Sequence, residues 1–210
     1  MLIIFAGVLV CGAVCFAADL WLLLGRRTLR PVLEADYARY VPGKPHTGEL
    51  FRAYCDTLTG NRMLSYIITM RLCAELECGS FLDKLRLQFY RVRLRRLQVR
   101  FGVEISYKTR IGAGLKISHG NGVVIHEGAQ IGCNCTILQQ VTIGNNPHKN
   151  RFQVPVIGDN CYIGAGAKVI GPILVGDDVI VGAQSVVNKD VPPGSVVAGV
   201  PAKIIRSVHV

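Results

Sequence analysis

A histidine that could transfer a proton lies inside a regular pattern of apolar residues. His119 stands in the segment KISHGNGVVI, residues 116–125, and a histidine side chain gains and loses a proton near neutral pH. Apolar residues recur every six positions before and after it, and the stretch around His119 breaks this spacing. In repeat proteins, residues inserted between repeats commonly carry the function. The break at His119 therefore favours an enzyme over a passive scaffold.

The elements that must position this histidine follow from the repeat. Isoleucine or valine occupies twelve positions in three runs, each spaced by six residues. These positions are Ile111, Ile117, Ile125, Ile131, Ile137, Ile143, Ile157, Ile163, Val169, Val175, Val181 and Val187. A spacing of six does not fit a helix, but it suits a short strand followed by a corner, with residues i and i−2 on one side. Three such sides close a coil of about 18 residues, so the pattern predicts a solenoid of about four coils.

Small residues accompany the repeat. A glycine follows the apolar residue at positions 112, 132, 144, 158, 164, 176 and 182, and we expect these glycines at the corners, where a positive φ costs them little. Two residues before an apolar position, a further small or apolar side chain is expected to face inward; examples are Ala129, Cys135, Val141, Cys161, Ala167 and Val179.

Two intervals between successive apolar positions of the repeat differ from six residues. Ile117 and Ile125 are eight residues apart, and the two additional residues fall around His119. Ile143 and Ile157 are fourteen residues apart, which is two more than a double repeat, and the segment NNPHKNRFQVP lies between them. We expect both breaks to form loops at corners of the coil.

The chain begins with a long apolar segment. Residues 1–24 carry one charge, at Asp19, and a helix of that length would measure about 36 Å, enough to cross a bilayer core of about 30 Å. A cleaved signal peptide would have its positive charge before the apolar run, whereas Arg26, Arg27 and Arg30 follow it. These arginines predict a membrane anchor with the remaining chain in the cytoplasm. A buried core helix or a helix lying on the membrane is the alternative.

The next segment, residues 25–100, is expected to be helical, basic and amphipathic. Between residues 81 and 101, apolar side chains follow the spacing of one helix face, at Leu87, Tyr90, Leu94, Leu97 and Phe101. Arginines stand beside this face, at positions 86, 91, 93, 95, 96 and 100. They indicate either a solvated face or contact with anionic lipid headgroups. Nucleic acid is not an expected partner, because aromatic residues do not alternate with the arginines and no nucleic-acid-binding motif accompanies them.

The composition indicates which ligands and which cysteine chemistry to expect. The formal net charge of +10 favours anionic ligands or surfaces. The eight cysteines form no CxxC pair with zinc-like partners, and we expect free thiols in a reducing compartment rather than a disulfide framework.

Taken together, several motifs resemble the hexapeptide-repeat acyltransferases with a left-handed β-helix, and in particular the branch of serine acetyltransferases and surface-polysaccharide O-acetyltransferases. The motifs are FGVEISYKTRIGAGLKISHGNGVVI, QQVTIGNN, IGDNCYIGAGAKVIGPI and VPPGSVVAGVPAKIIR, within residues 101–206. The resemblance implies a mainly β fold for residues 101–206, after the anchor (1–24) and the helical region (25–100), with a tail at 207–210. It also implies a homotrimer, with acetyl-CoA bound between neighbouring subunits and no metal.

The resemblance assigns roles to individual residues. His119 matches the general base that removes the proton of an acceptor hydroxyl, and Glu104 matches an acidic residue that orients the imidazole, with Glu here in place of Asp. Binding of acetyl-CoA is implied for Gly144, Gly164, Ala165, Ala183, Lys203 and Arg206, the last two beside its phosphates. Asn121, His148 and Gln153 are the residues expected to line the acceptor site, whereas His126 should face solvent and has no assigned role.

One departure from the serine acetyltransferases bears on the acceptor. Those enzymes carry an Arg-His pair before a proline, whereas Gln153 and Val154 precede Pro155 here. The sequence also ends at SVHV, without the tail through which serine acetyltransferases engage a partner enzyme. We therefore expect a sugar hydroxyl or a lipid-linked glycan as acceptor. Three alternatives stay open: a serine O-acetyltransferase, a zinc-dependent carbonic anhydrase built on the same coil, and a non-catalytic membrane-associated scaffold.

Overall fold

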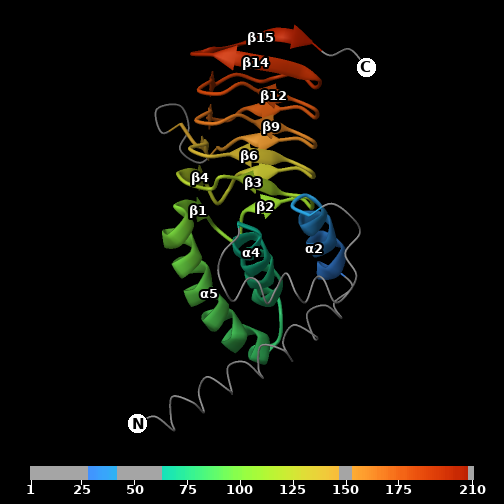
Figure 1. Cartoon of the computed structure of the whole chain (residues 1–210), viewed down its shortest axis with the longest axis vertical. Helices are drawn as coiled ribbons and strands as arrows, with labels where there is room; N and C mark the ends of the chain where they lie inside the picture. The colour runs from blue at the N-terminus through green and yellow to red at the C-terminus, as the bar shows by residue number, and fades with distance from the viewer. Residues whose placement is uncertain (1–27, 42–62, 147–152, 208–210) are drawn as a thin grey trace.

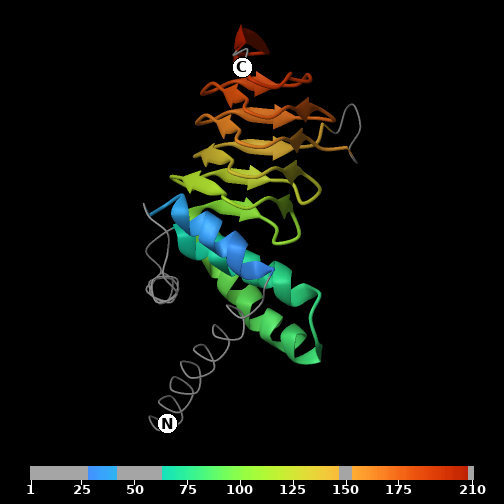
Figure 2. The ribbon, with the colours of Figure 1, turned by 90° about the vertical axis from the view of Figure 1, so that its right-hand side faces the viewer.

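The computed structural model describes residues 28–41, 63–146 and 153–207. Within these ranges, three helices are followed by a stack of short strands, and the helices gather at the end of the stack where the strands begin (Figure 1). A view turned by a quarter shows the same two layers, with all three helices below the coils (Figure 2). The architecture is a β-solenoid with a helical base.

The strands form three flat faces, which we call A, B and C. Neighbouring strands in each face are parallel, except that β15 runs antiparallel to β14. Face A contains β1 (Val103–Ile105), β4 (Val123–Ile125), β7 (Thr142–Gly144), β10 (Lys168–Ile170) and β13 (Val186–Val187). Face B contains β2 (Arg110–Ile111), β5 (Gln130–Ile131), β8 (Val156–Ile157) and β11 (Leu174–Val175). Face C contains β3 (Lys116–Ser118), β6 (Thr136–Leu138), β9 (Tyr162–Ile163), β12 (Ile180–Val181), β14 (Ser195–Gly199) and β15 (Ala202–Ser207).

The six-residue spacing is confirmed as the period of one side of the coil. Ile125 and Ile143, which are 18 residues apart, are partners in the register of face A. The repeated apolar positions are buried, apart from Ile111, which is half-buried at the bottom coil. The small residues two positions earlier are buried as well. The left hand of the coil stays a prediction from the resemblance.

The predicted reason for the repeated glycines was wrong. The glycines that follow the apolar positions do not have a positive φ, and that conformation is found instead at other turn residues, including Asn134, Asn160 and Asp178. Close approach between coils explains the glycines better. A Cβ on Gly112 would lie 2.6 Å from the backbone nitrogen of Cys133 in the next coil, and one on Gly164 would lie 2.7 Å from that of Ala183. A side chain there would push the coils apart.

The long interval in the repeat also differs from the prediction. Ile143 lies on face A and Ile157 on the adjacent face B, so the interval of fourteen positions crosses a single corner. The register agrees, because Ile131 pairs with Ile157 at a separation of 26 residues, whereas Ile125 and Ile143, which have no insertion between them, are 18 residues apart. The segment is therefore an insertion of eight residues at one corner, and not a double repeat with two additional residues.

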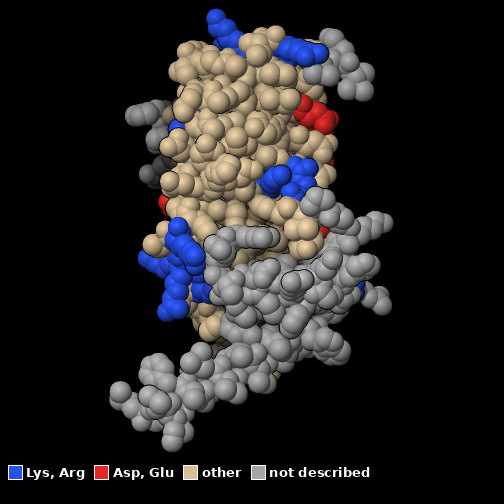
Figure 3. All heavy atoms as spheres, in the orientation of Figure 1, with Lys and Arg blue, Asp and Glu red and all other residues tan. Residues whose placement is uncertain are grey.

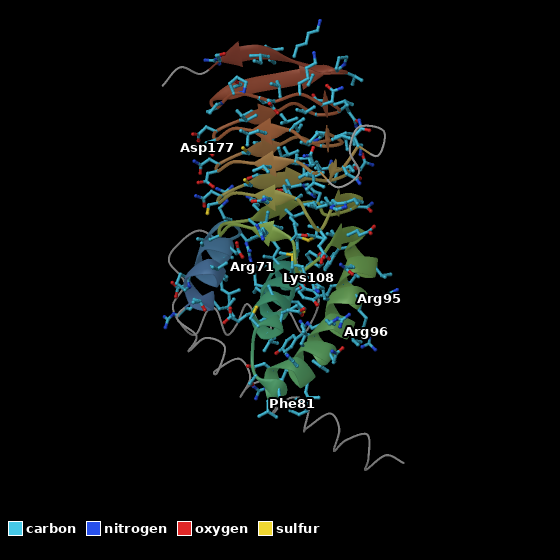
Figure 4. The ribbon with its side chains drawn as sticks, turned by 180° about the vertical axis from the view of Figure 1, so that it is seen from behind. Arg71, Phe81, Arg95, Arg96, Lys108 and Asp177 are labelled. Carbon is cyan, nitrogen blue, oxygen red and sulfur yellow. The ribbon has the colours of Figure 1, made fainter. Side chains whose placement is uncertain are left out.

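The helical base consists of α2 (Leu29–Ala38), α4 (Met63–Glu77) and α5 (Phe81–Phe101). A reciprocal capping box between Ser80 and Asp83 begins α5, and Gly102 in the left-handed conformation ends it. The predicted apolar face of α5 is confirmed, since its residues are buried, with Phe101 half-buried. The opposite side of α5 exposes several arginines, and Arg95 and Arg96 lie on its outer side (Figure 4).

A buried ion pair joins the helices to the bottom coils. Arg71 of α4 donates to both carboxylate oxygens of Asp36 in α2, at 2.9 and 3.3 Å. The same guanidinium donates to the carbonyl oxygens of Ile111 and Gly112, each at 2.5 Å. Asp36 also accepts the backbone N–H of Leu115 at 2.8 Å. Figure 4 shows Arg71 between the helices and the lowest strands. This pair therefore fixes the helical base against the solenoid.

The expected membrane anchor falls outside the described residues. Within residues 28–41, 63–146 and 153–207, no helix has both the length and the apolar character needed to cross a bilayer. Residues 1–24 are not among these ranges, so the anchor and the cytoplasmic placement of the domain stay predictions.

Candidate active site

His119 lies at the corner where the chain passes from face C to face A. It follows β3 directly, its side chain is exposed, and its φ of 55° is in the left-handed region that non-glycine residues rarely adopt. The two additional residues of the first break are accommodated at this corner, because Val103 of β1 pairs with Val123 of β4 at a separation of 20 residues instead of 18. The break in the repeat thus presents an exposed imidazole at an edge of the solenoid.

Four of the other predicted site residues share this edge. Backbone hydrogen bonds of 2.8–2.9 Å connect successive coils along it. The N–H of Gln140 donates to the carbonyl oxygen of Asn121, that of Gly166 to Gln139, and that of Gln184 to Ala165. Gly164 and Ala183 stand beside this ladder. His119, Asn121, Gly164, Ala165 and Ala183 therefore form one continuous strip, which we call the C–A edge.

A pocket of about 500 Å³ opens beside His119 on face C. It lies between the outward side chains of the lowest strands and the end of α2. Its lining consists of Ala38, Arg39, Lys116, Ser118, His119, Thr136, Leu138 and Tyr162. In Figure 3, which has the orientation of Figure 1, a small patch of Lys and Arg side chains lies in the lower part of the solenoid.

Glu104 lies in a separate, larger groove. Its side chain points outward from the middle of β1 and is exposed, in register with Val124 of β4. The groove, of about 800 Å³, runs between face A and α5. Among the described residues, no hydrogen bond joins Glu104 to His119. The expected pairing of the carboxylate with the imidazole is therefore not formed here, although both residues lie near the lower end of the solenoid.

The groove also contains charged residues that sequence reasoning did not select. Arg91 and Arg95 line it from α5, and Glu127 lines it from the turn after β4. Glu127 accepts a hydrogen bond from Ser106 at 2.6 Å. The four-residue spacing of the two arginines, which places them on one side of a helix, was the available signal for Arg91 and Arg95. No local pattern marked Glu127.

A hydrogen-bonded trio stands beside this groove. Tyr107 Oη donates to Glu77 Oε2 at 2.9 Å, and Lys108 Nζ lies 3.3 Å from Glu77 Oε1. The bond from Tyr107, helped by Lys108, lowers the pKa of Glu77. Burial and the neighbouring Glu77 raise the pKa of Tyr107. At neutral pH, Glu77 is therefore ionised and Tyr107 is protonated.

The remaining predicted residues lie elsewhere. Gly144 ends β7 on the opposite side of face A from His119, and a Cβ there would meet nothing within 4 Å, which leaves open space for a ligand. Gln153 is exposed at the end of the inserted loop. His148 falls in the range 147–152, outside the described residues. Lys203 and Arg206 are exposed on β15 at the far end of face C.

His126 faces solvent, as predicted. Its Nδ1 accepts the backbone N–H of Gly128 at 3.0 Å, an interaction within its own turn. The exposed ring therefore has a local structural partner, and its surroundings differ from those of His119.

The described cysteines are free thiols. Cys73, Cys135 and Cys161 are buried, whereas Cys78 and Cys133 are exposed. Burial raises the pKa of the Cys73 thiol to about 12. The neighbouring Cys161 thiol, together with burial, raises the pKa of Cys135. Thiols held in the protonated form are poor nucleophiles, so a covalent acyl-cysteine route through Cys73 or Cys135 is disfavoured.

Comparisons with known proteins agree with this geometry. A family model described as bacterial transferase hexapeptide (six repeats) matches residues 155–189. A serine acetyltransferase of Mycobacterium tuberculosis is 47% identical over 104 residues, which is 50% of this chain and 45% of that protein. The matched part thus spans about half the length of this curated relative.

Solved structures extend the likeness to the helical base. The soybean serine acetyltransferase complexed with serine matches with a TM-score of 0.68 and 32% identity, over 86% of this chain and 70% of that chain. A serine acetyltransferase in complex with CoA matches with a TM-score of 0.64 and 27% identity, over 85% of this chain and 70% of that chain. The likeness therefore covers more of the chain than the repeat alone.

Proposed function

Because the chain belongs to the hexapeptide-repeat transferase family, we propose that it transfers an acetyl group from acetyl-CoA to a hydroxyl oxygen, with L-serine as the acceptor. The observation that carries this proposal is the 47% identity with a serine acetyltransferase over the 104 matched residues. The relatives with bound serine and with bound CoA support the same pair of substrates.

In this proposal, His119 is the general base. The imidazole removes the proton of the acceptor hydroxyl while the oxygen attacks the thioester carbonyl carbon. The carbon–sulfur bond then breaks, and the CoA sulfur takes the proton back from the imidazolium. The exposed position of His119 at a corner supports this role, because a substrate can approach it. Glu104 would stabilise the imidazolium, as the carboxylate does in hydrolytic triads, once substrate or a neighbouring subunit brings the two together.

Acetyl-CoA binding is assigned to the small residues of the C–A edge. Ala165 and Ala183 leave room for the pantetheine arm to reach backbone groups, and Lys203 and Arg206 would meet the phosphates at the far end. Gly164 is also required by the packing of the coils, because the next coil leaves no room for a side chain there.

A groove completed by a second subunit accounts for the separation of the remaining site residues. His119 lies on one edge of face A, whereas Gly144 lies on the other edge, about 10 Å away for strands of three residues. A homotrimer, which the resemblance implies, would bring the Gly144 edge of one subunit to the His119 edge of its neighbour.

A sugar hydroxyl is the second candidate acceptor. It is the acceptor predicted from the sequence, and the matched serine acetyltransferases support serine better. What still favours the sugar is the position before Pro155, where Gln153 and Val154 offer no positive charge for an amino-acid carboxylate. Gln153 is exposed at this position and Val154 is half-buried.

The test is CoA release by the purified full chain, followed by mass spectrometry. Acetyl-CoA is offered with L-serine in one series and with nucleotide-linked or lipid-linked sugars in another. Formation of O-acetylserine is the expected result. Acetylation of a sugar and not of serine would replace serine by the second candidate, and no CoA release with either acceptor would contradict acetyl transfer. Native mass spectrometry of the same sample is expected to show three copies of the chain.

A further inference from the structure

The pocket beside His119 is positively charged. Among its described lining residues are two cations, Arg39 from the end of α2 and Lys116 from β3, and no carboxylate. The nearest acidic residue along the chain, Asp36, is fully buried and is bound to Arg71 and to the backbone of Leu115. The positive charge of the pocket is therefore not neutralised by the residues that line it.

Both cations retain free hydrogen-bonding capacity. Arg39 Nη2 donates to Thr136 Oγ1 at 2.6 Å, whereas its Nε is buried without a hydrogen-bond partner among the described residues. The Lys116 side chain makes no ion pair or hydrogen bond within the described part of the chain, although the backbone N–H of this residue donates to the carbonyl oxygen of Cys135 at 2.9 Å. A buried donor without a partner costs free energy, which a bound acceptor atom would recover.

The pocket is held in place by neighbouring contacts. The hydroxyl of Tyr40, next to Arg39, accepts the N–H of Ile117 at 2.7 Å and donates to the carbonyl of the same residue at 3.1 Å. These bonds join the end of α2 to β3, the strand that carries Lys116 and leads into His119. The two cations and the imidazole are therefore positioned by one rigid junction, which suits a binding site.

We propose that Arg39 and Lys116 bind an anionic group of the acceptor, a carboxylate or a phosphate, beside His119. The inference rests on the proposed function and narrows its substrate class to hydroxyl compounds that carry a negative charge. For serine, the two cations would supply the charge that Gln153 and Val154 lack. For a sugar, they would select a phosphorylated form over a neutral one.

The donor's phosphates are a poor alternative occupant. Face C runs from β3 through β6, β9, β12 and β14 to β15. Lys203 and Arg206, which are assigned to those phosphates, lie on β15 and are therefore five strands away from Lys116 on β3. At about 4.8 Å per strand this separation is about 24 Å. An anion in the pocket therefore belongs to the acceptor end of the site.

Calorimetry on the full chain without acetyl-CoA tests the anion site separately from turnover. The probes are two pairs that differ in charge: L-serine with L-serinamide, and glucose 1-phosphate with glucose. We expect the anionic member of at least one pair to bind at least tenfold more tightly than its neutral partner. The pair that shows this difference identifies carboxylate or phosphate as the preferred group.

Variants assign the effect to the pocket. Lys116→Gln is expected to raise the dissociation constant of the anionic probe about tenfold, equivalent to about 1.4 kcal/mol, and Lys116→Arg to restore it. Lys189→Gln removes one positive charge from an exposed turn and is the matched control, with no expected change. Equal binding of charged and neutral probes, or an unchanged constant in Lys116→Gln, would overturn the inference. Because no donor is present, failure of acetyl transfer would count against the proposed function alone.

Discussion

Replacing His119 by alanine is expected to lower kcat for CoA release about 10²–10⁴-fold, the range that a positioned general base contributes. A serine or sugar hydroxyl is almost fully protonated at neutral pH, so the reaction depends on a group that takes the proton during attack. His119 is exposed at the corner that interrupts the repeat, and its removal leaves the buried residues of the coils unchanged. The melting temperature is therefore expected to stay close to that of the wild type.

Asn134→Ala is the matched control, because Asn134 is also exposed at a corner of the solenoid, has a φ of 56°, and lines neither the groove with Glu104 nor the pocket beside His119. It is expected to retain most of the wild-type kcat. The measurement is the rate of CoA release at saturating acetyl-CoA, with calorimetry of CoA binding to both variants. If His119→Ala kept the wild-type rate, another group would have to accept the proton. Equal losses in the two variants would point to a general effect on the coil.

The path of the chain could be predicted from the sequence because the repeat is a local property. One buried residue in every six, with a partner two positions earlier, defines a strand and its inward side, and Ile125, Ile131 and Ile137 lie on three successive faces as expected. The apolar face of α5 was predicted for the same reason, since its apolar residues recur every three or four positions along the chain.

The errors arose where the spacing alone is ambiguous. A count of fourteen between Ile143 and Ile157 fits either a skipped apolar position or an insertion at one corner, and only pairing between coils distinguishes them. The repeated glycines follow the strands at the corners, as predicted, but the reason for glycine there was predicted wrongly. The atom nearest to a Cβ on Gly112 belongs to a residue 21 positions later, and a local pattern does not show such a contact.

The candidate site was predictable only in part, because its pocket joins distant segments. The corner histidine could be found from the break in the repeat. Arg39 contacts Thr136, which is 97 residues later, and no local pattern indicates such a contact. Lys116 belongs to a short strand of the repeat, and only the packed structure places the end of α2 beside it. The charge of the pocket is therefore a property of the packed structure.

The second large effect concerns the stability of the helical base. Asp36→Ala is expected to lower the free energy of unfolding by about 3–5 kcal/mol, the usual cost of removing one partner of a buried ion pair. The Asp36 side chain is 0% exposed and that of Arg71 is 11% exposed. Without the carboxylate, the guanidinium retains only two backbone carbonyls, and the N–H of Leu115 loses its acceptor. Thermal and urea unfolding of the full chain measure this difference.

Glu34→Ala is the control, because Glu34 belongs to the same helix and forms an ion pair with Arg30 at 2.8 Å in which both side chains are well exposed. Exposed pairs of this kind contribute less than about 1 kcal/mol, so the two variants should differ several-fold in their effect. Asp36→Asn should fall between them, since it keeps one acceptor oxygen and loses the charge. Because Asp36 and Arg71 join α2 and α4 to the coil that leads into His119, the loss of stability should also appear as faster amide exchange in α2. Similar losses in Asp36→Ala and Glu34→Ala would mean that the junction does not depend on the buried pair.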